Sequence, residues 1–539
     1  MPVIETQRSR GSEDFAKNRE QMLALVEHFR GLEAKVREHS GRQAAKFSKR
    51  GQLLPRERIA RLLDRGAPWL ELASLAGYKM HDDDGDSGIA GGGSIAGIGF
   101  VAGRRCLVGA SDSAIKGGAV SPMGLRKSLR AQEIALANKL PCVNLVESAG
   151  ANLLYQSELF IDGGRVFANM ARMSAAGIPH ITVVHGSSTA GGAYLPGLSD
   201  YVVVVKGRSR IFLAGPPLVK AALGEDADEE ALGGAEMHMS VAGTAEYMAD
   251  DDARAIALAR ELLAKIPWDE SAVRAPARAW QPPRHDPDEL CGIVPVDYRQ
   301  PYDVREIIAR IVDDSDFLDF KPRYGEQTIC GHARVEGHAV AFIGNNGPIF
   351  PEGAAKAGHF IQACCQSGTP IVYLQNTTGY MVGQRAEEHG IVKHGAKMIQ
   401  AVANASVPQI TVVVGGSFGA GNYGMCGRSF DPRFIFSWPN ARVSVMGGEQ
   451  AAKVMEIITK AKFARQGVVI DDENLAKMST AVKQKLESES DALFSTARLW
   501  DDGIIDPRDT RRVIAMTLAT CREAAARTLR TSSFGVARL

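Results

Sequence analysis

The sequence predicts an α/β protein built from two related domains in tandem. Strand-like runs of β-branched residues alternate with helical patterns in both halves, which favours parallel sheets with helices outside. A glycine-rich loop follows such a run twice, at residues 181–196 (ITVVHGSSTAGGAYLP) and 409–425 (QITVVVGGSFGAGNYGM). The chain has 539 residues, which is more than one core of ordinary size contains.

The spacing of the glycines indicates an internal duplication. Gly150 and Gly191 lie 41 residues apart, and so do Gly379 and Ala420. The flanking segments also correspond: 144–151 (NLVESAGA) with 373–380 (YLQNTTGY), and 211–217 (IFLAGPP) with 443–450 (VSVMGGEQ). Gly-rich turns recur by chance in a glycine-rich chain, but several spacings agree here, so we favour duplication.

Composition excludes several classes of protein. A formal net charge of +1 provides no field for nucleic acid or an anionic membrane. The eight cysteines include no Cys-x-x-Cys pair, so neither a zinc ribbon nor a disulfide framework is indicated, and metal-ligand spacing is absent. No signal-peptide core and no run of about 18 apolar residues is present. We expect a soluble, cytoplasmic protein without a metal on this chain.

In chain order, apolar residues at helical spacing predict a helix over residues 14–38, within an N-terminal segment 1–45. An N-terminal domain is expected at 46–270, a Pro/Arg-rich linker at 271–289, and a C-terminal domain at 290–539. The elements predicted in the first domain are a strand at 106–110, a helix at 124–138, a strand at 142–146, a helix near 164–176 and a strand at 180–184.

Two nucleotide-binding motifs are rejected. The glycines at 97, 99 and 103 resemble a dinucleotide fingerprint, but their spacing is wrong by one, and a strand, a turn and a strand are predicted where a helix is needed. The chain contains no Gly-Lys pair, so it has no Walker A loop.

A hydrolase motif competes more strongly. Residues 415–419 (GGSFG) match the nucleophile elbow of α/β-hydrolases, but that fold places its histidine after the serine, and no histidine follows His394. Ser417 is therefore interpreted as a loop residue. His185 and Glu147 lie near the glycine loops, where a single histidine beside a core strand is usually structural.

The two loops suggest two sites where backbone N–H groups hold a negatively charged oxygen. Neither site has an evident side-chain acid or base. Backbone oxyanion donors supply much of the catalysis in some enzymes, so a reaction whose reagent brings its own base would suit this chain.

Long motifs now point to a family: residues 129–153 (LRAQEIALANKLPCVNLVESAGANL), 187–200 (SSTAGGAYLPGLSD), 376–383 (NTTGYMVG) and 424–434 (GMCGRSFDPRF). The chain resembles the carboxyltransferase β subunit of biotin-dependent acyl-CoA carboxylases, in the methylcrotonyl-CoA and geranyl-CoA carboxylase group. The resemblance covers nearly the whole chain and implies two tandem crotonase-like domains, each a ββα superhelix, related by the duplication.

The resemblance also implies roles for particular residues. The N-terminal half would bind the acyl-CoA and hold its thioester oxygen; the residues concerned are Gly191 and Gly192, with Lys116, Gly117, Gly118, Ala149, Gly150, Gly163 and Gly164 around the substrate. The C-terminal half would bind carboxybiotin through Ala420 and Gly421, near Thr378, Gly379 and Tyr380. Carboxybiotin would release CO2, and the resulting biotin enolate would remove the substrate proton.

Partners follow from the same resemblance. The biotin is expected on a partner biotin carboxylase/biotin carrier α subunit, because Ala396-Lys397-Met398 is only a partial match to a biotinylation site. Members of the family form a homo-hexamer, a trimer of dimers, with each active site between the N half of one subunit and the C half of another. The non-enzymatic alternative is a scaffold β subunit without catalytic activity. This alternative is disfavoured because both glycine loops are intact.

Gly163 bears on which acyl-CoA is used. Methylcrotonyl-CoA relatives carry a bulky aromatic residue at this place, whereas geranyl-CoA carboxylases carry glycine. The resemblance therefore favours geranyl-CoA, with 3-methylcrotonyl-CoA, propionyl-CoA or another acyl-CoA as alternatives.

Overall fold

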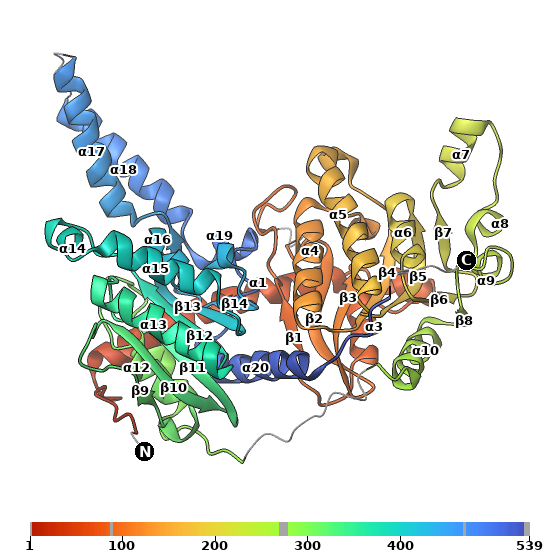
Figure 1. The fold of residues 1–539 in the computed structure, drawn as a ribbon. Helices are drawn as coiled ribbons and strands as arrows, with labels where there is room; N and C mark the ends of the chain where they lie inside the picture. The colour runs from red at the N-terminus through yellow and green to blue at the C-terminus, as the bar shows by residue number, and fades with distance from the viewer. Residues whose placement is uncertain (1–2, 87–89, 269–278, 467–470, 533–539) are drawn as a thin grey trace. The chain divides into compact units, whose positions relative to one another are not determined.

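The computed structural model describes residues 3–86, 90–268, 279–466 and 471–532 (Figure 1). The chain forms two compact units. The N-unit comprises Gly31–Arg274, Ala497–Leu499 and Thr520–Leu539, and the C-unit comprises Met1–Arg30, Ala275–Thr496 and Trp500–Ala519. Each unit therefore includes terminal segments, unlike the contiguous domains 46–270 and 290–539 expected above. Those ranges stay a prediction, and residues 271–278 of the expected linker 271–289 lie outside the described residues.

The N-unit is built on one sheet with the strand order β1-β2-β3-β4-β5-β6-β8, and β7 also pairs with β5. The strands are β1 (Leu70–Leu72), β2 (Ser94–Val101), β3 (Arg104–Ser111), β4 (Cys142–Ser148), β5 (His180–Thr189), β6 (Tyr201–Val205), β7 (Arg210–Phe212) and β8 (Tyr247–Ala249). Pairing is antiparallel from β1 to β3 and parallel from β3 onward. The turn at Gly103 joins two antiparallel strands, as predicted.

The C-unit repeats this plan with the order β14-β13-β12-β11-β10-β9, and β15 pairs with β13 as β7 pairs with β5. Its strands are β9 (Leu318–Asp319), β10 (Thr328–Val335), β11 (His338–Asn345), β12 (Ile371–Thr377), β13 (Gln409–Phe418), β14 (Phe434–Ser437) and β15 (Arg442–Ser444). Every residue of β12 and β13 is buried, as expected for parallel strands covered on both faces.

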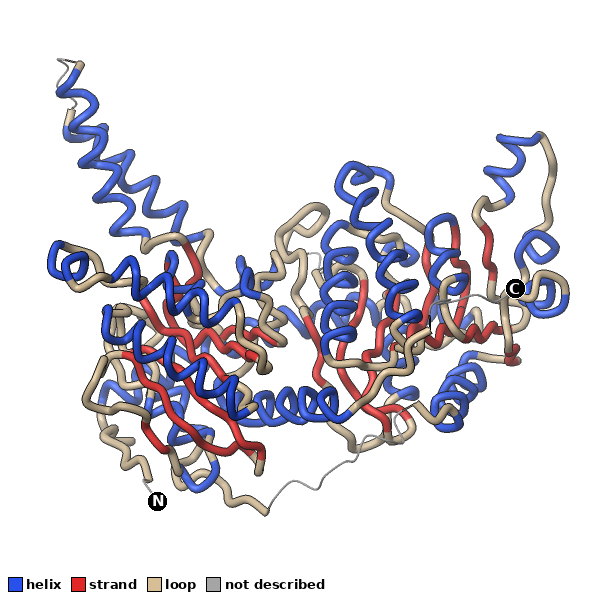
Figure 2. Tube along the Cα trace, viewed as in Figure 1, coloured by secondary structure: helices blue, strands red, loops and turns tan. Residues whose placement is uncertain are grey.

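Helices cover the sheets (Figure 2). The N-unit carries α2 (Ala44–Lys49), α3 (Pro55–Leu62), α4 (Pro122–Ala137), α5 (Gln156–Ala175), α6 (Tyr194–Gly197), α7 (Pro216–Leu223), α8 (Glu229–Gly233), α9 (Ala235–Ser240) and α10 (Asp252–Lys265). The C-unit carries α11 (Leu290–Ile293), α12 (Arg305–Ile311), α13 (Pro351–Ser367), α14 (Gln384–Glu388), α15 (Ile391–Ala403), α16 (Gly419–Gly424), α17 (Gly448–Arg465) and α18 (Asp472–Ser488). Helices α1 (Glu13–Gly41), α19 (Ala492–Ala497) and α20 (Thr510–Ala526) include residues of both units.

Capping explains where the central helices begin and end. Pro122 of α4 and Pro351 of α13 occupy the first turn, where a missing N–H is harmless. The Ser121 side chain also accepts a 3.1 Å hydrogen bond from the N–H of Gly124. Helix α13 ends at Gly368 in the left-handed conformation, with φ 69°. No helix of the described ranges is long and apolar enough to cross a membrane.

The duplication is confirmed residue by residue. Residues 120–152 correspond to 349–381 with a constant offset of 229, and β5 and β13 begin with the same offset. Even an isolated bridge recurs, since Val120 pairs with Ala151 and Ile349 with Tyr380. The predicted helix near 164–176 begins earlier than expected, at Gln156, and continues through Gly163 and Gly164.

Candidate functional site

In the N-unit, the ends of β4 and β5 form two loops that nearly touch. Gly150 follows β4 with φ 86°, a conformation that favours glycine. A Cβ at this position would lie 3.1 Å from the carbonyl oxygen of Thr189, the last residue of β5. The N–H of Gly150 donates to Ser148 Oγ at 3.2 Å, which fixes the loop. Ala149, the residue before Gly150, is exposed.

The turn after β5 presents its backbone. Ala190 adopts φ 55°, and a short helical turn over Ala190–Ala193 follows. The first N–H groups of a helical turn have no partner within it, so they are available to a ligand. Gly191 is exposed and Gly192 is buried, and the carbonyl of Gly192 accepts a 2.8 Å hydrogen bond from Ser188 Oγ.

A third segment joins this site. Lys116, Gly117 and Gly118 have consecutive φ values of 46°, 63° and 75°. A Cβ on Gly118 would collide with the carbonyl oxygen of Glu147, and a Cβ on Gly117 would lie 3.9 Å from the Ala149 Cβ. The structure therefore brings these predicted residues together with the β4 and β5 loops.

Helix α5 carries Gly163 and Gly164, where an added Cβ would meet no atom within 4 Å. Gly163 is one helical turn before Phe167, so the two residues share a face of α5. The Phe167 ring reaches the glycine turn, since its Cζ would lie 3.7 Å from a Cβ on Gly191. It also packs against Tyr194 with ring centroids 5.6 Å apart. Gly163 thus lies beside the site, although outside the loops.

The C-unit reproduces the two loops. Gly379, with φ 117°, is the counterpart of Gly150, and the turn at Gly419 has φ 54° where Ala190 has 55°. A Cβ on Gly421 would lie 2.8 Å from Gly379 Cα, so the loops approach as closely as glycine allows. Thr378 and Ala420 are exposed, as Ala149 and Gly191 are in the other repeat.

Tyr380 behaves differently from its neighbours. Its ring packs against the core of the C-unit, and its hydroxyl donates to the carbonyl of Gly395 at 3.5 Å. Burial raises the pKa of this phenol. The side chain of Tyr380 therefore supports the loop from beneath.

Each unit carries a glycine turn beside a second glycine loop, and both follow the carboxyl ends of neighbouring parallel strands in that unit's sheet. This arrangement agrees with a known family. The carboxyl transferase domain model matches residues 46–536. This chain belongs to the carboxyl transferase family.

Relatives cover nearly the whole chain. The probable methylcrotonoyl-CoA carboxylase beta chain, mitochondrial, of Drosophila melanogaster is 46% identical, with 96% of this chain and 92% of the relative covered. The probable biotin-dependent acyl-coenzyme A carboxylase beta2 subunit of Mycobacterium tuberculosis is 48% identical, with 91% of each chain covered. The crystal structure of the P. aeruginosa geranyl-CoA carboxylase beta subunit is 59% identical, with 100% of both chains covered and a TM-score of 0.94. The carboxyl transferase thus has the crotonase-like, two-domain fold that the sequence predicted.

A cleft of about 520 Å³ adjoins the N-unit loops of the carboxyl transferase. Three cationic side chains line it, together with polar groups and the glycine loops: Gln43, Lys46, Phe47, Arg50, Ser113, Ala114, Lys116, Gly117, Glu147, Ala149, Ser187 and Thr189. Lys116 also forms an ion pair with Asp82, which accepts a 2.8 Å hydrogen bond from the Tyr155 hydroxyl. Sequence reasoning missed the contribution of α2 to this cleft.

Glu147 and His185 belong to a buried network beneath the cleft. Arg58 donates to Glu147 Oε2 at 2.9 Å and to Asp252 Oδ2 at 3.3 Å. His185 Nδ1 lies 3.0 Å from Asp252 Oδ1. Burial lowers the pKa of His185, so its imidazole is neutral. The Ser113 hydroxyl also donates a 2.8 Å hydrogen bond to Glu147. The carboxylates are thus held by structural partners, consistent with the structural interpretation of His185.

Ser417 lies within strand β13, so its interpretation as a loop residue is wrong, but its contacts are structural rather than those of a nucleophile. Its hydroxyl is fully buried, donates to Gln375 Oε1 at 2.6 Å, and accepts from Asn422 Nδ2 at 2.8 Å. We expect Ser417→Ala to lower the free energy of unfolding by about 1 kcal/mol and to leave turnover near that of the wild type. Urea unfolding and steady-state carboxylation measure the two effects. A loss of several orders of magnitude in turnover would instead support the hydrolase-like nucleophile.

Proposed function

We propose that this enzyme transfers a carboxyl group from carboxybiotin to the γ-carbon of a branched α,β-unsaturated acyl-CoA, with geranyl-CoA as the favoured substrate. The observation that carries the proposal is the pair of matched turns, one at Gly191–Gly192 and one at Ala420–Gly421. Each offers backbone N–H groups just after the carboxyl end of a central parallel strand. Carboxylation of a panel of acyl-CoAs, assayed with the matched α subunit, tests it.

In the N-unit, the amides of Gly191 and Gly192 are proposed to hold the thioester oxygen. Deprotonation of the substrate places negative charge on this oxygen, and donors at about 2.7–3.1 Å from it stabilise that charge. The neighbouring cleft suits coenzyme A, because Lys46, Arg50 and Lys116 provide positive charge for its phosphates. Gly117 and Gly118 let the backbone approach the substrate closely.

In the C-unit, Ala420 and Gly421 are proposed to hold the ureido oxygen of biotin, with Thr378, Gly379 and Tyr380 beside it. The close approach of Gly421 to Gly379 leaves room for no side chain at position 421, so the backbone there can approach the planar ureido group closely. When bound, carboxybiotin would supply the carboxyl group, and the biotin left after decarboxylation would supply the base. The chain's own residues orient the reactants and stabilise charge.

The same proposal extends to partners. We propose that the biotin is carried by a biotin carboxylase/biotin carrier α subunit, and that this chain forms a homo-hexamer arranged as a trimer of dimers. We place the assembly in the cytoplasm, although the Drosophila relative is named as mitochondrial. A non-catalytic scaffold subunit is disfavoured because both glycine turns keep their geometry.

Two observations favour geranyl-CoA. Identity to the geranyl-CoA carboxylase beta subunit is 59%, against 46% to the Drosophila methylcrotonoyl-CoA carboxylase chain. Gly163 also leaves open space on the face of α5 that carries Phe167. A geranyl chain has five more carbons than a methylcrotonyl group, and enclosing them contributes up to ~4 kcal/mol. A carboxylase for 3-methylcrotonyl-CoA is the second candidate, because several relatives carry that name.

We expect Gly163→Phe to lower the ratio of kcat/KM for geranyl-CoA over 3-methylcrotonyl-CoA by about 10- to 200-fold, as the ring occupies the open space. Gly163→Ala separates ring size from helix propensity, since it adds only a methyl group to α5. Initial rates with both substrates give the ratio. A wild-type enzyme that ignores geranyl-CoA, or a ratio unmoved by phenylalanine, would contradict the assignment.

A further inference from the structure

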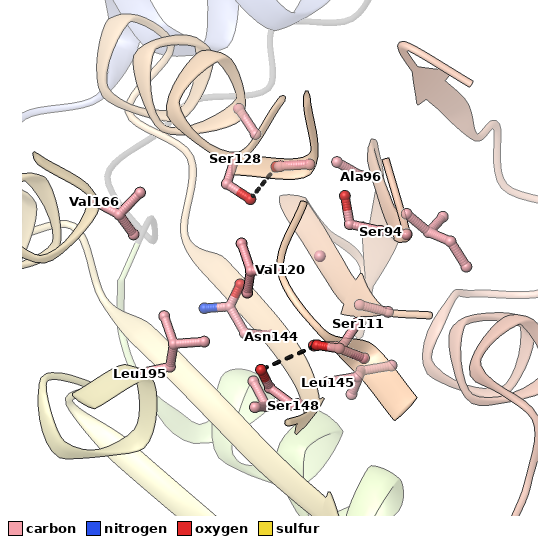
Figure 3. Close-up of a pocket in the computed structure, with 18 of the residues that line it drawn as sticks. Ser94, Ala96, Ser111, Val120, Ser128, Asn144, Leu145, Ser148, Val166 and Leu195 are labelled. Carbon is pink, nitrogen blue, oxygen red and sulfur yellow. Dashed lines mark hydrogen bonds between the residues drawn. The ribbon is translucent and has the colours of Figure 1, made fainter. Parts of the chain in front are cut away.

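A cavity of about 160 Å³ lies inside the N-unit, between its sheet and helices α4 and α5 (Figure 3). Strands β2, β3 and β4 form one wall, the two helices form the other, and Leu195 of α6 closes one side. None of the described residues that line it is Asp, Glu, Lys or Arg. His180 also lines it, and burial lowers the pKa of this ring to about 4, so the ring is neutral. The cavity is therefore an uncharged space.

The same place in the C-unit is filled. Ala131 and Asn144 line the cavity, and their counterparts at the offset of 229 are Phe360 and Tyr373. Both aromatic rings are fully buried in one core cluster, and the Tyr373 hydroxyl donates to Gln409 Oε1 at 2.8 Å. Two large-to-small differences between repeats thus account for the cavity.

Such a space is unusual in a folded core. Protein interiors are close-packed, and voids larger than a water molecule destabilise them in proportion to their volume. The C-unit shows that this fold packs the position with aromatic side chains. The retention of this uncharged and mostly apolar space in the N-unit, where Phe360 and Tyr373 fill the equivalent place of the C-unit, therefore points to an occupant bound by the N-unit.

The cavity adjoins the glycine turns. Ser148 lines it and donates to the carbonyl of Gly118 at 3.1 Å. A Cβ on Gly192 would lie 3.3 Å from the Ser148 Cβ, so one end of the cavity lies directly behind the proposed thioester site. Val166 and Met170, three and seven residues after Gly163, also line it, so Gly163 lies on the face of α5 that borders this space.

We propose that this cavity receives the distal, apolar end of the acyl chain, a branched unit of about five carbons. The inference rests on the proposed acyl-CoA carboxylase function and extends it to a second set of specificity residues, Ala131 and Asn144. By volume, a five-carbon isoprenoid unit fits a space of 160 Å³, since a cavity of about 150 Å³ accommodates benzene. The proximal carbons and the thioester would remain at the glycine turns.

The test transplants the residues of the filled repeat. Ala131→Phe and Asn144→Tyr are each expressed with the matched α subunit, and kcat/KM is measured for geranyl-CoA and 3-methylcrotonyl-CoA. We expect the ratio of the two to fall by at least about tenfold, because the shorter chain does not reach the cavity. Ala131→Val provides a smaller filling that a core tolerates if the phenylalanine variant does not fold. Ala137→Val makes the same type of change at an exposed position of α4 and should leave the ratio unchanged.

The outcomes separate the two proposals. If the wild type does not carboxylate geranyl-CoA, the proposed substrate fails before any variant is needed. If the wild type does so but folded filling variants keep its ratio, only the cavity inference is overturned. An equal loss for both substrates would place the effect on the glycine turns and would also overturn it.

Discussion

Replacing Gly192 by valine is expected to lower turnover by about 10²- to 10³-fold, the effect of losing one oxyanion donor. The Cβ of the valine would lie 3.3 Å from both Cβ and Oγ of Ser148, which is closer than an ordinary van der Waals contact. The two further carbons of valine must then displace the turn or enter the space of the thioester. Single-turnover carboxylation with the α subunit measures the effect.

Gly197→Val is the matched control for this change. Gly197 lies in α6, a few residues after the turn, and an added Cβ would meet no atom within 4 Å. We expect it to keep turnover close to that of the wild type. A folded Gly192→Val enzyme with undiminished turnover would show that the thioester oxygen is held elsewhere.

Arg58→Met is expected to lower the free energy of unfolding by about 3–5 kcal/mol, because it leaves buried carboxylates without their cation. The Arg58 side chain is 1% exposed, and it contacts both Glu147 and Asp252. Its guanidinium also lies over the Phe47 ring of α2, 5.8 Å from the centroid. Urea unfolding, followed by fluorescence, gives the change in midpoint.

Arg61→Met serves as the control on the same helix, since Arg61 is exposed and should cost no more than about 0.5 kcal/mol. The dependence of the free energy of unfolding on pH provides a second measurement. Burial raises the pKa of Asp252, but the hydrogen bond from His185 and the charge of Arg58 outweigh it and hold this pKa below its usual value. Its stabilisation is complete at neutral pH and is lost as the pH falls below about 4. An Arg58→Met variant as stable as the Arg61→Met control would show that the Arg58 network does not stabilise the fold.

The parts of the fold that follow from local chemistry could be predicted from the sequence. The spacing of Gly150 and Gly191 revealed the repeat, because a backbone that must turn sharply at two places accepts little besides glycine. Strands β4 and β5 were found from their β-branched runs, although both extend further than predicted, through bulges near Ser148 and Ser188. Hydrophobic runs locate a strand, whereas its end depends on pairing partners.

Other features depend on tertiary contacts. Arg58, Gln52 and Asp252 are distant in sequence from Glu147, and no local pattern links them. Gln52 nevertheless donates to the carbonyl of His185 at 3.0 Å. The start of α5 was missed because Gly163 and Gly164 have low helix propensity, which packing overrides. The cavity was also invisible, since Ala131 is an ordinary helix residue until it is compared with Phe360.

The matched turns have a consequence for how such an enzyme diversifies. One presents Gly191 and the other Ala420, yet their amides occupy equivalent places, because a backbone donor depends on conformation and not on the side chain. Among point mutations, only those to proline remove such an N–H group, and the others can disturb it only by crowding or by changing the conformation of the turn. Side chains around the turns are then free to vary under selection for new acyl groups while the charge-stabilising step is inherited intact. Among descendants of this chain, substrate range should change far more readily than reaction type.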